Sequence, residues 1–143
     1  MIWFRPTTLE DVRQRYGSVP SLATHLGIEM IALGPDFLTG RMPVDARTQQ
    51  PYGLLHGGAS CVLAETLGSY AASLVIDREV ARVVGLEINA NHVRPATHGA
   101  VLGTARPLHL GKRTQVWDIR IESEASHELV CVSRLTIAVL RAR

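Results

Sequence analysis

The longest hydrophobic segment of the chain runs from Gly53 to Ile76 and reads GLLHGGASCVLAETLGSYAASLVI. It is rich in Ala and Leu and contains no Pro, and it is too long for an ordinary strand. The composition therefore predicts a helix of about twenty residues, roughly 30 Å long. Apolar side chains occur almost all round it, which is typical of a helix buried on most sides. Small residues such as Gly57, Gly58 and Gly68 would let a sheet or another helix approach its backbone closely.

After this helix, apolar and polar residues alternate, which is the pattern of strands with one buried face. In the first such stretch, Val83 to Arg94, the predicted buried set is Val84, Leu86, Ile88 and Ala90. His92 and Arg94 share the parity of this set, so we expect them to emerge on the helix-covered face where the strand leaves the core. Three more strands are predicted over Gly99 to Leu110, Thr114 to Glu122 and Leu129 to Leu140.

The N-terminal part of the chain carries shorter signals. They predict a helix from Thr7 or Thr8 to Tyr16 that Gly17 ends, a helical turn from Pro20 to His25, and a hairpin of the strands Ile28 to Leu33 and Phe37 to Met42. The expected fold class is α+β, with about six antiparallel strands curled around one long helix. At 143 residues, the chain is expected to form a single domain over residues 1–143.

Composition and charge exclude several classes of function. The 46% hydrophobic content suits a domain with a real core, and the net charge of +2 arises from Lys and Arg scattered among acids, so no nucleic acid partner is expected. No secretion signal or membrane span is predicted, and we expect a soluble, cytoplasmic protein. Cys61 and Cys131 are interpreted as buried thiols in a reducing compartment. The histidines fit no ligand spacing, so we expect no metal and no cofactor.

Glu65 is the leading candidate for chemistry. It is the only charged residue between Thr48 and Ile76. A carboxylate in the middle of a buried helix costs stability unless it is paired or used, since any apolar residue would serve the core better. We therefore predict a catalytic role for Glu65.

Three segments in order resemble a known family. They are GLLHGGASCVLAETLGS (Gly53 to Ser69), VGLEINANHVRPA (Val84 to Ala96) and PLHLGKRTQVW (Pro107 to Trp117). Together they resemble the hotdog-fold acyl-CoA thioesterases of the aryl-CoA type, a group with members in menaquinone synthesis and in enterobactin-pathway proofreading. The resemblance covers nearly the whole chain. It implies a hotdog fold, metal-free hydrolysis of CoA or carrier-protein thioesters, and a homodimer usually paired into a homotetramer.

The geometry of one helix also predicts a dimer. A thioesterase must stabilise the oxyanion that forms on the attacked carbonyl, and the free N–H groups at a helix N-terminus are suitable donors. Gly57 would let the carbonyl oxygen approach closely. Glu65 lies eight residues further on, roughly 12 Å along the axis, too far to share that carbonyl. An antiparallel second helix would bring Glu65 of one chain to Gly57 of the other.

The resemblance and the spacing together suggest roles for the site residues. Glu65 would attack the thioester carbon or activate a water, and both routes stay open. The Gly57 N–H would polarise the carbonyl. His56 and Gln50 match family positions that position the carbonyl, the glutamate or the water, and the alternative for His56 is a residue that only holds the loop before the helix. Ser69 lies one turn after Glu65 and matches a position near the acyl group, but a core hydroxyl bonded to a carbonyl is the alternative.

Coenzyme A carries phosphates, which call for cations near the mouth of the site. The candidates are His92, Arg94, His109, Lys112 and Arg113, for each of which an ordinary solvated charge is an equal explanation. Leu54, Leu55, Val62, Leu63, Tyr70 and the Trp3-Phe4 segment are interpreted first as core residues and second as walls of an acyl pocket.

Two other functions are compatible with a hotdog fold. A hotdog hydratase or dehydratase is disfavoured because the His-Phe-Pro and Pro-Gly segments of carrier-protein dehydratases do not occur here. A non-catalytic acyl-CoA-binding module would not need an acid or base. The presence of Glu65 together with Gln50, His56 and Gly57 argues against it.

Overall fold

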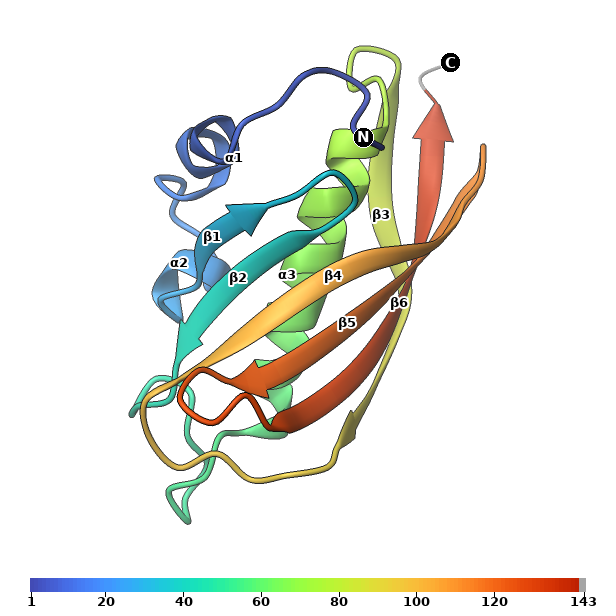
Figure 1. Cartoon of the computed structure of the whole chain (residues 1–143). Coiled ribbons are helices and arrows are strands. Elements are labelled where there is room, and N and C mark those ends of the chain that lie inside the picture. The colour runs from blue at the N-terminus through green and yellow to red at the C-terminus, as the bar shows by residue number, and fades with distance from the viewer. Residues whose placement is uncertain (142–143) are drawn as a thin grey trace.

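The computed structural model describes residues 1–141 of the chain. In this part of the chain three helices and six strands follow one another, and Figure 1 shows their arrangement. Their order is α1 (Leu9–Tyr16), α2 (Leu22–His25), β1 (Glu29–Leu33), β2 (Leu38–Pro43), α3 (Gly57–Val75), β3 (Ala81–His92), β4 (Ala100–Leu110), β5 (Thr114–Ser123) and β6 (Leu129–Arg141).

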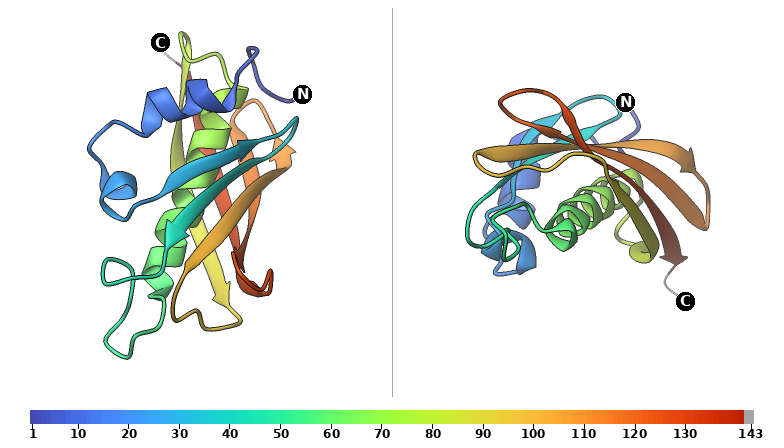
Figure 2. Two further views of the ribbon diagram at one scale, coloured as in Figure 1. Left: turned by 60° about the vertical axis from the view of Figure 1, so that its left-hand side comes forward. Right: turned by 90° about the horizontal axis from the view of Figure 1, so that it is seen from below.

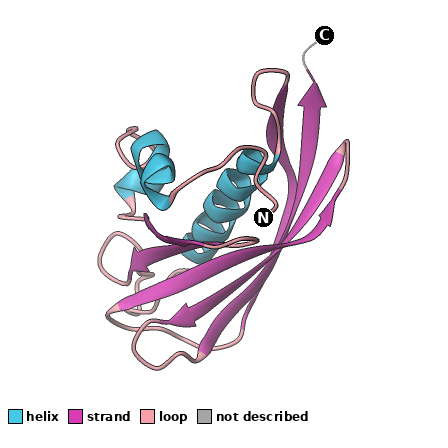
Figure 3. Cartoon of the chain, turned by 45° about the horizontal axis from the view of Figure 1, so that its top comes forward, coloured by secondary structure: helices cyan, strands magenta, loops and turns pink. Residues whose placement is uncertain are grey.

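The six strands form one antiparallel sheet in the order β1-β2-β4-β5-β6-β3. The sheet curls around α3, which lies in its concave face, as the view from below in Figure 2 shows. All three helices lie on the same side of the sheet (Figure 3). This is the α+β hotdog architecture predicted from the sequence. The strand order leaves β1 and β3 at the two edges, and β3 pairs with β6 alone.

The long helix α3 is buried along the side that faces the sheet. Its fully buried residues include Leu63, Ala64, Leu67, Ala71 and Ala72. They pack against the inward-facing side chains of the central strands, such as Trp117, Ile119 and Leu135. The sheet approaches so closely that a Cβ on Gly103 of β4 would lie 2.7 Å from Cδ1 of Leu67. The burial of large apolar side chains along both surfaces is the main source of stability here.

The N-terminal elements form where the sequence predicts them. Thr8 caps α1 in a capping box with Asp11, and Gly17 follows the last helical residue. Ser21 caps the short α2 in the same way with Thr24. β1 and β2 form the predicted hairpin.

The predicted burial pattern of β3 is wrong in its first half. Val84 and Leu86 are 45% and 62% exposed, whereas Ile88 and Ala90 pack against the core as predicted. The cause is a β-bulge: Gly85 pairs with Ile137 and Glu87 with Thr136, so Leu86 is an extra residue. A bulge reverses the alternation of side chains. Before the bulge, Val83 packs against the core in place of Val84. After the bulge, the inward-facing residues are Ile88 and Ala90, as predicted.

The two cysteines differ from each other. Cys131 on β6 is fully buried, and burial raises the pKa of its thiol to about 11. Cys61 on α3 is only half-buried, which corrects the expectation that both thiols are buried. Both are free.

Candidate active site

The N-terminus of α3 presents backbone donors to a hollow in the surface. His56 is the N-cap, and its Nδ1 accepts a hydrogen bond of 2.8 Å from the Gly58 N–H. Its carbonyl accepts from the N–H groups of Ala59 and Ser60. Within residues 1–141, no hydrogen bond is formed by the N–H of Gly57. Because Nδ1 is an acceptor, a neutral His56 ring carries its proton on Nε2.

The hollow beside Gly57 has a volume of about 360 Å³. Gln50 lines it from the loop before the helix, and His92 and Arg94 line it from the end of β3. The Gln50 side chain accepts a hydrogen bond from the Tyr52 N–H, which folds the loop back on itself. The structure thus brings Gln50, Gly57, His92 and Arg94 to one place. As predicted from its parity, His92 faces the helix: a Cβ on Gly57 would lie 2.7 Å from its Nε2.

Glu65 lies half-buried in the middle of α3. The Ser69 hydroxyl donates a hydrogen bond of 3.3 Å to its Oε1. The Ser69 hydroxyl thus contacts the carboxylate one turn away and not a backbone carbonyl, and its place near the acyl group stays a prediction. On the strand side the carboxylate lies against Gly85 of β3, where a Cβ would overlap Oε1 and lie 3.4 Å from Cδ. No salt bridge to Glu65 is found in the described chain.

Gly57 and Glu65 lie on the same flank of α3 but do not meet within one chain. Gly57 faces His92 and Glu65 faces Gly85, so both look toward the edge strand β3. The eight residues between them correspond to roughly 12 Å along the axis. Each chain therefore carries two of the predicted site residues, Gly57 and Glu65, apart from each other along one flank of α3.

The predicted phosphate-binding cations fall into two groups at opposite ends of α3. His92 and Arg94 lie at its N-terminal end, where Arg94 pairs with Glu128 at 3.4 Å and donates to the Leu129 carbonyl. Of the other three, His109 lies near the end of β4, and Lys112 and Arg113 belong to the β4–β5 turn. Lys112 there lines a hollow with Val75 and Ile76, at the other end of α3 (Figure 1).

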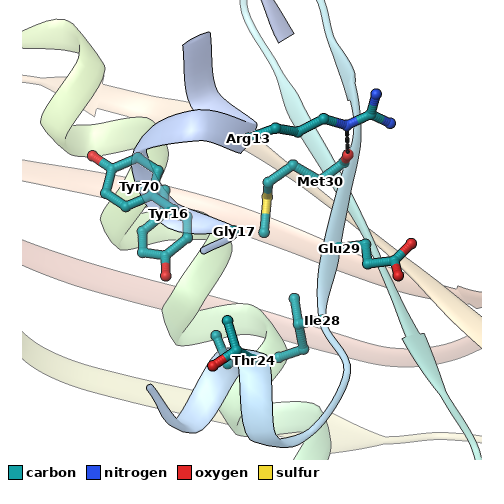
Figure 4. A pocket seen from close by; sticks show the side chains of 9 residues that line it. Arg13, Tyr16, Gly17, Thr24, Ile28, Glu29, Met30 and Tyr70 are labelled. Carbon is teal, nitrogen blue, oxygen red and sulfur yellow. Dashed lines mark hydrogen bonds between the residues drawn. The ribbon is translucent and has the colours of Figure 1, made fainter. Parts of the chain in front are cut away.

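A second cavity, shown in Figure 4, lies between α1, α2, β1 and α3 and has a volume of about 230 Å³. Its wall includes Tyr70, whose ring stacks on Tyr16 with centroids 3.8 Å apart. The Tyr16 and Ser73 hydroxyls are hydrogen-bonded at 2.6 Å, and burial raises the pKa of Tyr70. Tyr70 is rotated by roughly 140° from Glu65 around the helix, so it does not share the Glu65 flank.

The other residues predicted to line an acyl pocket lie in different parts of the structure. Leu54 and Leu55 line the hollow beside Gly57, whereas Leu63 and Trp3 are buried in the core and Phe4 is 51% exposed. Sequence reasoning missed Gly85. The available signal was a glycine inside a strand pattern, which often marks a bulge or a close approach of another group.

Over residues 1–141, no three His, Cys, Asp or Glu side chains come together as a metal site. None of the helices there has the length and hydrophobicity needed to span a membrane.

Comparison with known proteins identifies the family. The thioesterase superfamily profile matches residues 52–130. The chain is 52% identical over 140 residues to the 1,4-dihydroxy-2-naphthoyl-CoA hydrolase of Escherichia coli, covering 98% of this chain and 100% of the other. It is 51% identical over 140 residues to the proofreading thioesterase EntH of Cronobacter turicensis, covering 98% and 99%. A crystal structure of a Haemophilus influenzae thioesterase superposes with a TM-score of 0.91 at 49% identity, covering 99% and 96%. The chain therefore belongs to the thioesterase superfamily, with the hotdog fold of a thioester hydrolase.

Proposed function

We propose that the protein hydrolyses acyl-CoA or carrier-protein thioesters to the free acid and the thiol, with Glu65 as nucleophile or general base and the Gly57 N–H as carbonyl polariser. One observation carries the proposal. Within residues 1–141, a half-buried carboxylate without an ion-pair partner and a helix N-terminal N–H without an acceptor lie on the same flank of α3. Thioester hydrolysis needs both kinds of group.

The active unit is a homodimer in this proposal. A second chain placed antiparallel along the β3 edge would set its Glu65 opposite Gly57 of the first, and twofold symmetry would create two equal sites. Val84 and Leu86, exposed on this edge by the bulge, give the second chain an apolar surface to cover. Pairing of two such dimers into a tetramer follows the family resemblance.

The reaction begins with the thioester carbonyl oxygen accepting from the Gly57 N–H in the hollow beside it. The Glu65 carboxylate of the other chain attacks the carbonyl carbon, or removes a proton from a water that attacks. The tetrahedral oxyanion collapses, the C–S bond breaks, and the thiolate leaves and takes up a proton. In the nucleophilic route a mixed anhydride remains, which water cleaves to the acid and free Glu65.

An aryl acyl group is the favoured substrate. The Escherichia coli relative is named for 1,4-dihydroxy-2-naphthoyl-CoA and the Cronobacter relative for proofreading, so we infer hydroxybenzoyl- or dihydroxynaphthoyl-CoA as the class to test. In the antiparallel dimer, the β4–β5 turn of one chain would come to the end where its partner carries His92 and Arg94. Lys112 and Arg113 of that turn, with His109 at the adjoining end of β4, would then join them around the CoA phosphates.

The deciding experiment measures release of free thiol from benzoyl-, dihydroxynaphthoyl- and medium-chain acyl-CoA by the wild type and by Glu65→Gln. We expect cleavage of an aryl thioester and at least a hundredfold loss of kcat in Glu65→Gln, with the dimer intact by sedimentation. Glu10→Gln, which alters an exposed carboxylate on α1, is the matched control and should keep full activity. An active Glu65→Gln would refute the mechanism. Binding of CoA esters without cleavage would refute hydrolysis and favour a binding module.

A further inference from the structure

Gly85 lies at a place on β3 where a side chain would collide with the Glu65 carboxylate. A Cβ built on Gly85 would overlap Oε1 of Glu65, and it would lie 3.4 Å from Cδ and 3.6 Å from Oε2. The backbone of Gly85 does not need glycine for its conformation, because its φ is not in the left-handed region. The structure therefore indicates that glycine occupies position 85 because it leaves space for the Glu65 carboxylate.

The bulge explains why this position faces the helix. Gly85 pairs with Ile137 and shares the inward parity of Val83, and the extra residue Leu86 follows it directly. Without the bulge, a strand in phase with Ile88 and Ala90 would turn Leu86 toward α3 and Gly85 away from it. The bulge thus brings a residue without a side chain under Glu65.

Two groups then confine the same carboxylate oxygen. The Ser69 hydroxyl donates to Oε1 along the helix, and Gly85 gives Oε1 its place against β3. Oε2 accepts no hydrogen bond from Ser69, and it would lie 3.6 Å from a Cβ on Gly85. In the described chain, no other side chain donates a hydrogen bond to either oxygen.

We propose that Gly85 is a positioning residue for Glu65: its missing Cβ and the adjacent bulge seat Oε1 between Ser69 and β3 and leave Oε2 to face the thioester carbon or the attacking water. This inference rests on the proposed function, in which Glu65 is the reacting carboxylate. The inference adds that the edge strand β3 determines where the Glu65 carboxylate lies.

The test is Gly85→Ala, assayed with the best aryl thioester. We expect kcat to fall about 10- to 100-fold with KM within about twofold, because a displacement of about 1 Å in a reacting group has a cost of that order. Glu65→Asp, whose carboxylate is one methylene shorter, should cost less activity in the Gly85→Ala background than in the wild type. Full kcat in a folded, dimeric Gly85→Ala overturns the proposal.

Gly103→Ala is the matched control. It adds a methyl group to another strand glycine that faces α3, where it would meet Leu67 and Leu63 and not Glu65. It should lower thermal stability while the folded protein keeps its kcat. An equal loss of kcat in Gly103→Ala would mean that any disturbance of the strand–helix interface lowers turnover, which overturns a specific role for Gly85.

A crystal structure of Gly85→Ala separates this inference from the proposed function. The expected result is a Glu65 carboxylate displaced from Ser69; an unmoved carboxylate overturns the inference even if Glu65→Gln is inactive. If Glu65→Gln is active, the proposed mechanism fails and the catalytic part of this inference fails with it, and a displaced carboxylate then shows only that Gly85 holds the Glu65 side chain in place. Should Gly85→Ala not fold, Ser69→Ala frees Oε1 without adding atoms, and an unchanged kcat there overturns the proposal.

Discussion

Nε2 of His92 lies 2.7 Å from the position that a Cβ on Gly57 would occupy, so the end of β3 lies close to the start of α3 at the Gly57 N–H. The contact predicts the effect of Gly57→Ala. The added methyl group would force His92 or the first turn of α3 to move. We expect kcat to fall about 10²-fold, as for the loss of one oxyanion donor, with His92→Ala restoring part of it in the double variant. Wild-type kcat in Gly57→Ala would show that this N–H does not contact the carbonyl.

His56 can be tested for two separate roles. His56→Ala removes the N-cap of α3, and we expect the free energy of unfolding in urea to fall by about 1 kcal/mol. His56→Asn supplies another capping oxygen and should restore stability. Both variants lose the Nε2–H of the histidine ring. We therefore expect low turnover in His56→Ala and equally low turnover in His56→Asn. If Asn restores kcat as well, capping is the whole role of His56.

The exposed edge of β3 predicts how assembly can be broken. Leu86→Glu places a charge on the apolar edge that the bulge exposes, and we expect it to yield monomers in sedimentation with the loss of thioesterase activity. Leu22→Glu, at a leucine of similar exposure on α2, is the control and should remain dimeric and active. A dimeric, active Leu86→Glu would place the subunit contact elsewhere.

The β4–β5 turn should matter for coenzyme A but not for the chemical step. Lys112→Gln combined with Arg113→Gln is expected to raise KM for benzoyl-CoA roughly fivefold, corresponding to about 1 kcal/mol of binding. The matched substrate is benzoyl-N-acetylcysteamine, which lacks phosphates and should show an unchanged KM. Equal increases for both thioesters would contradict phosphate binding by this turn.

The raised pKa of the buried Cys131 thiol predicts that the folded protein loses stability in alkaline solution. Its folded-state pKa of about 11 lies above the ordinary thiol value near 8.5, so the folded state holds its proton where the unfolded state has lost it. Stability is complete below pH 8.5 and falls as pH rises toward 11, by up to about 1.4 kcal/mol per pH unit. Urea unfolding of the wild type and Cys131→Ala from pH 7 to 10 checks this, since the variant should show a smaller slope. Equal slopes would contradict it.

Much of the fold could be predicted from the sequence because long elements carry strong periodic signals. The apolar run of α3 and the alternation in β4, β5 and β6 identify the elements, with ends that differ from the structure by a residue or so. The bulge after Gly85 could not be predicted, because one extra residue leaves the composition unchanged and only reverses the parity. For this reason the alternation predicts the wrong face of the sheet for Val84 and Leu86.

The candidate site was predictable in its parts but not in its assembly. Glu65 stands out as the lone charge in an apolar helix, and the HGG segment marks the helix start. The separation of the β4–β5 turn from His92 and Arg94 depends on which way the strands run in the sheet, and this information is absent from local patterns. The contact between Glu65 and Gly85 joins residues twenty positions apart in different elements and needed the structure.

The separation of Gly57 and Glu65 along one flank of α3 has a genetic consequence. If each site takes one of these residues from each chain, two alleles that are each inactive can complement one another. In a mixed dimer of Gly57→Ala and Glu65→Gln chains, one site collects both substitutions and the other collects none. Refolding the two variants together in equal amounts should return about a quarter of the wild-type sites, although neither variant alone has any. Activity in this protein is then a property of the pair, and selection acts on the two copies jointly.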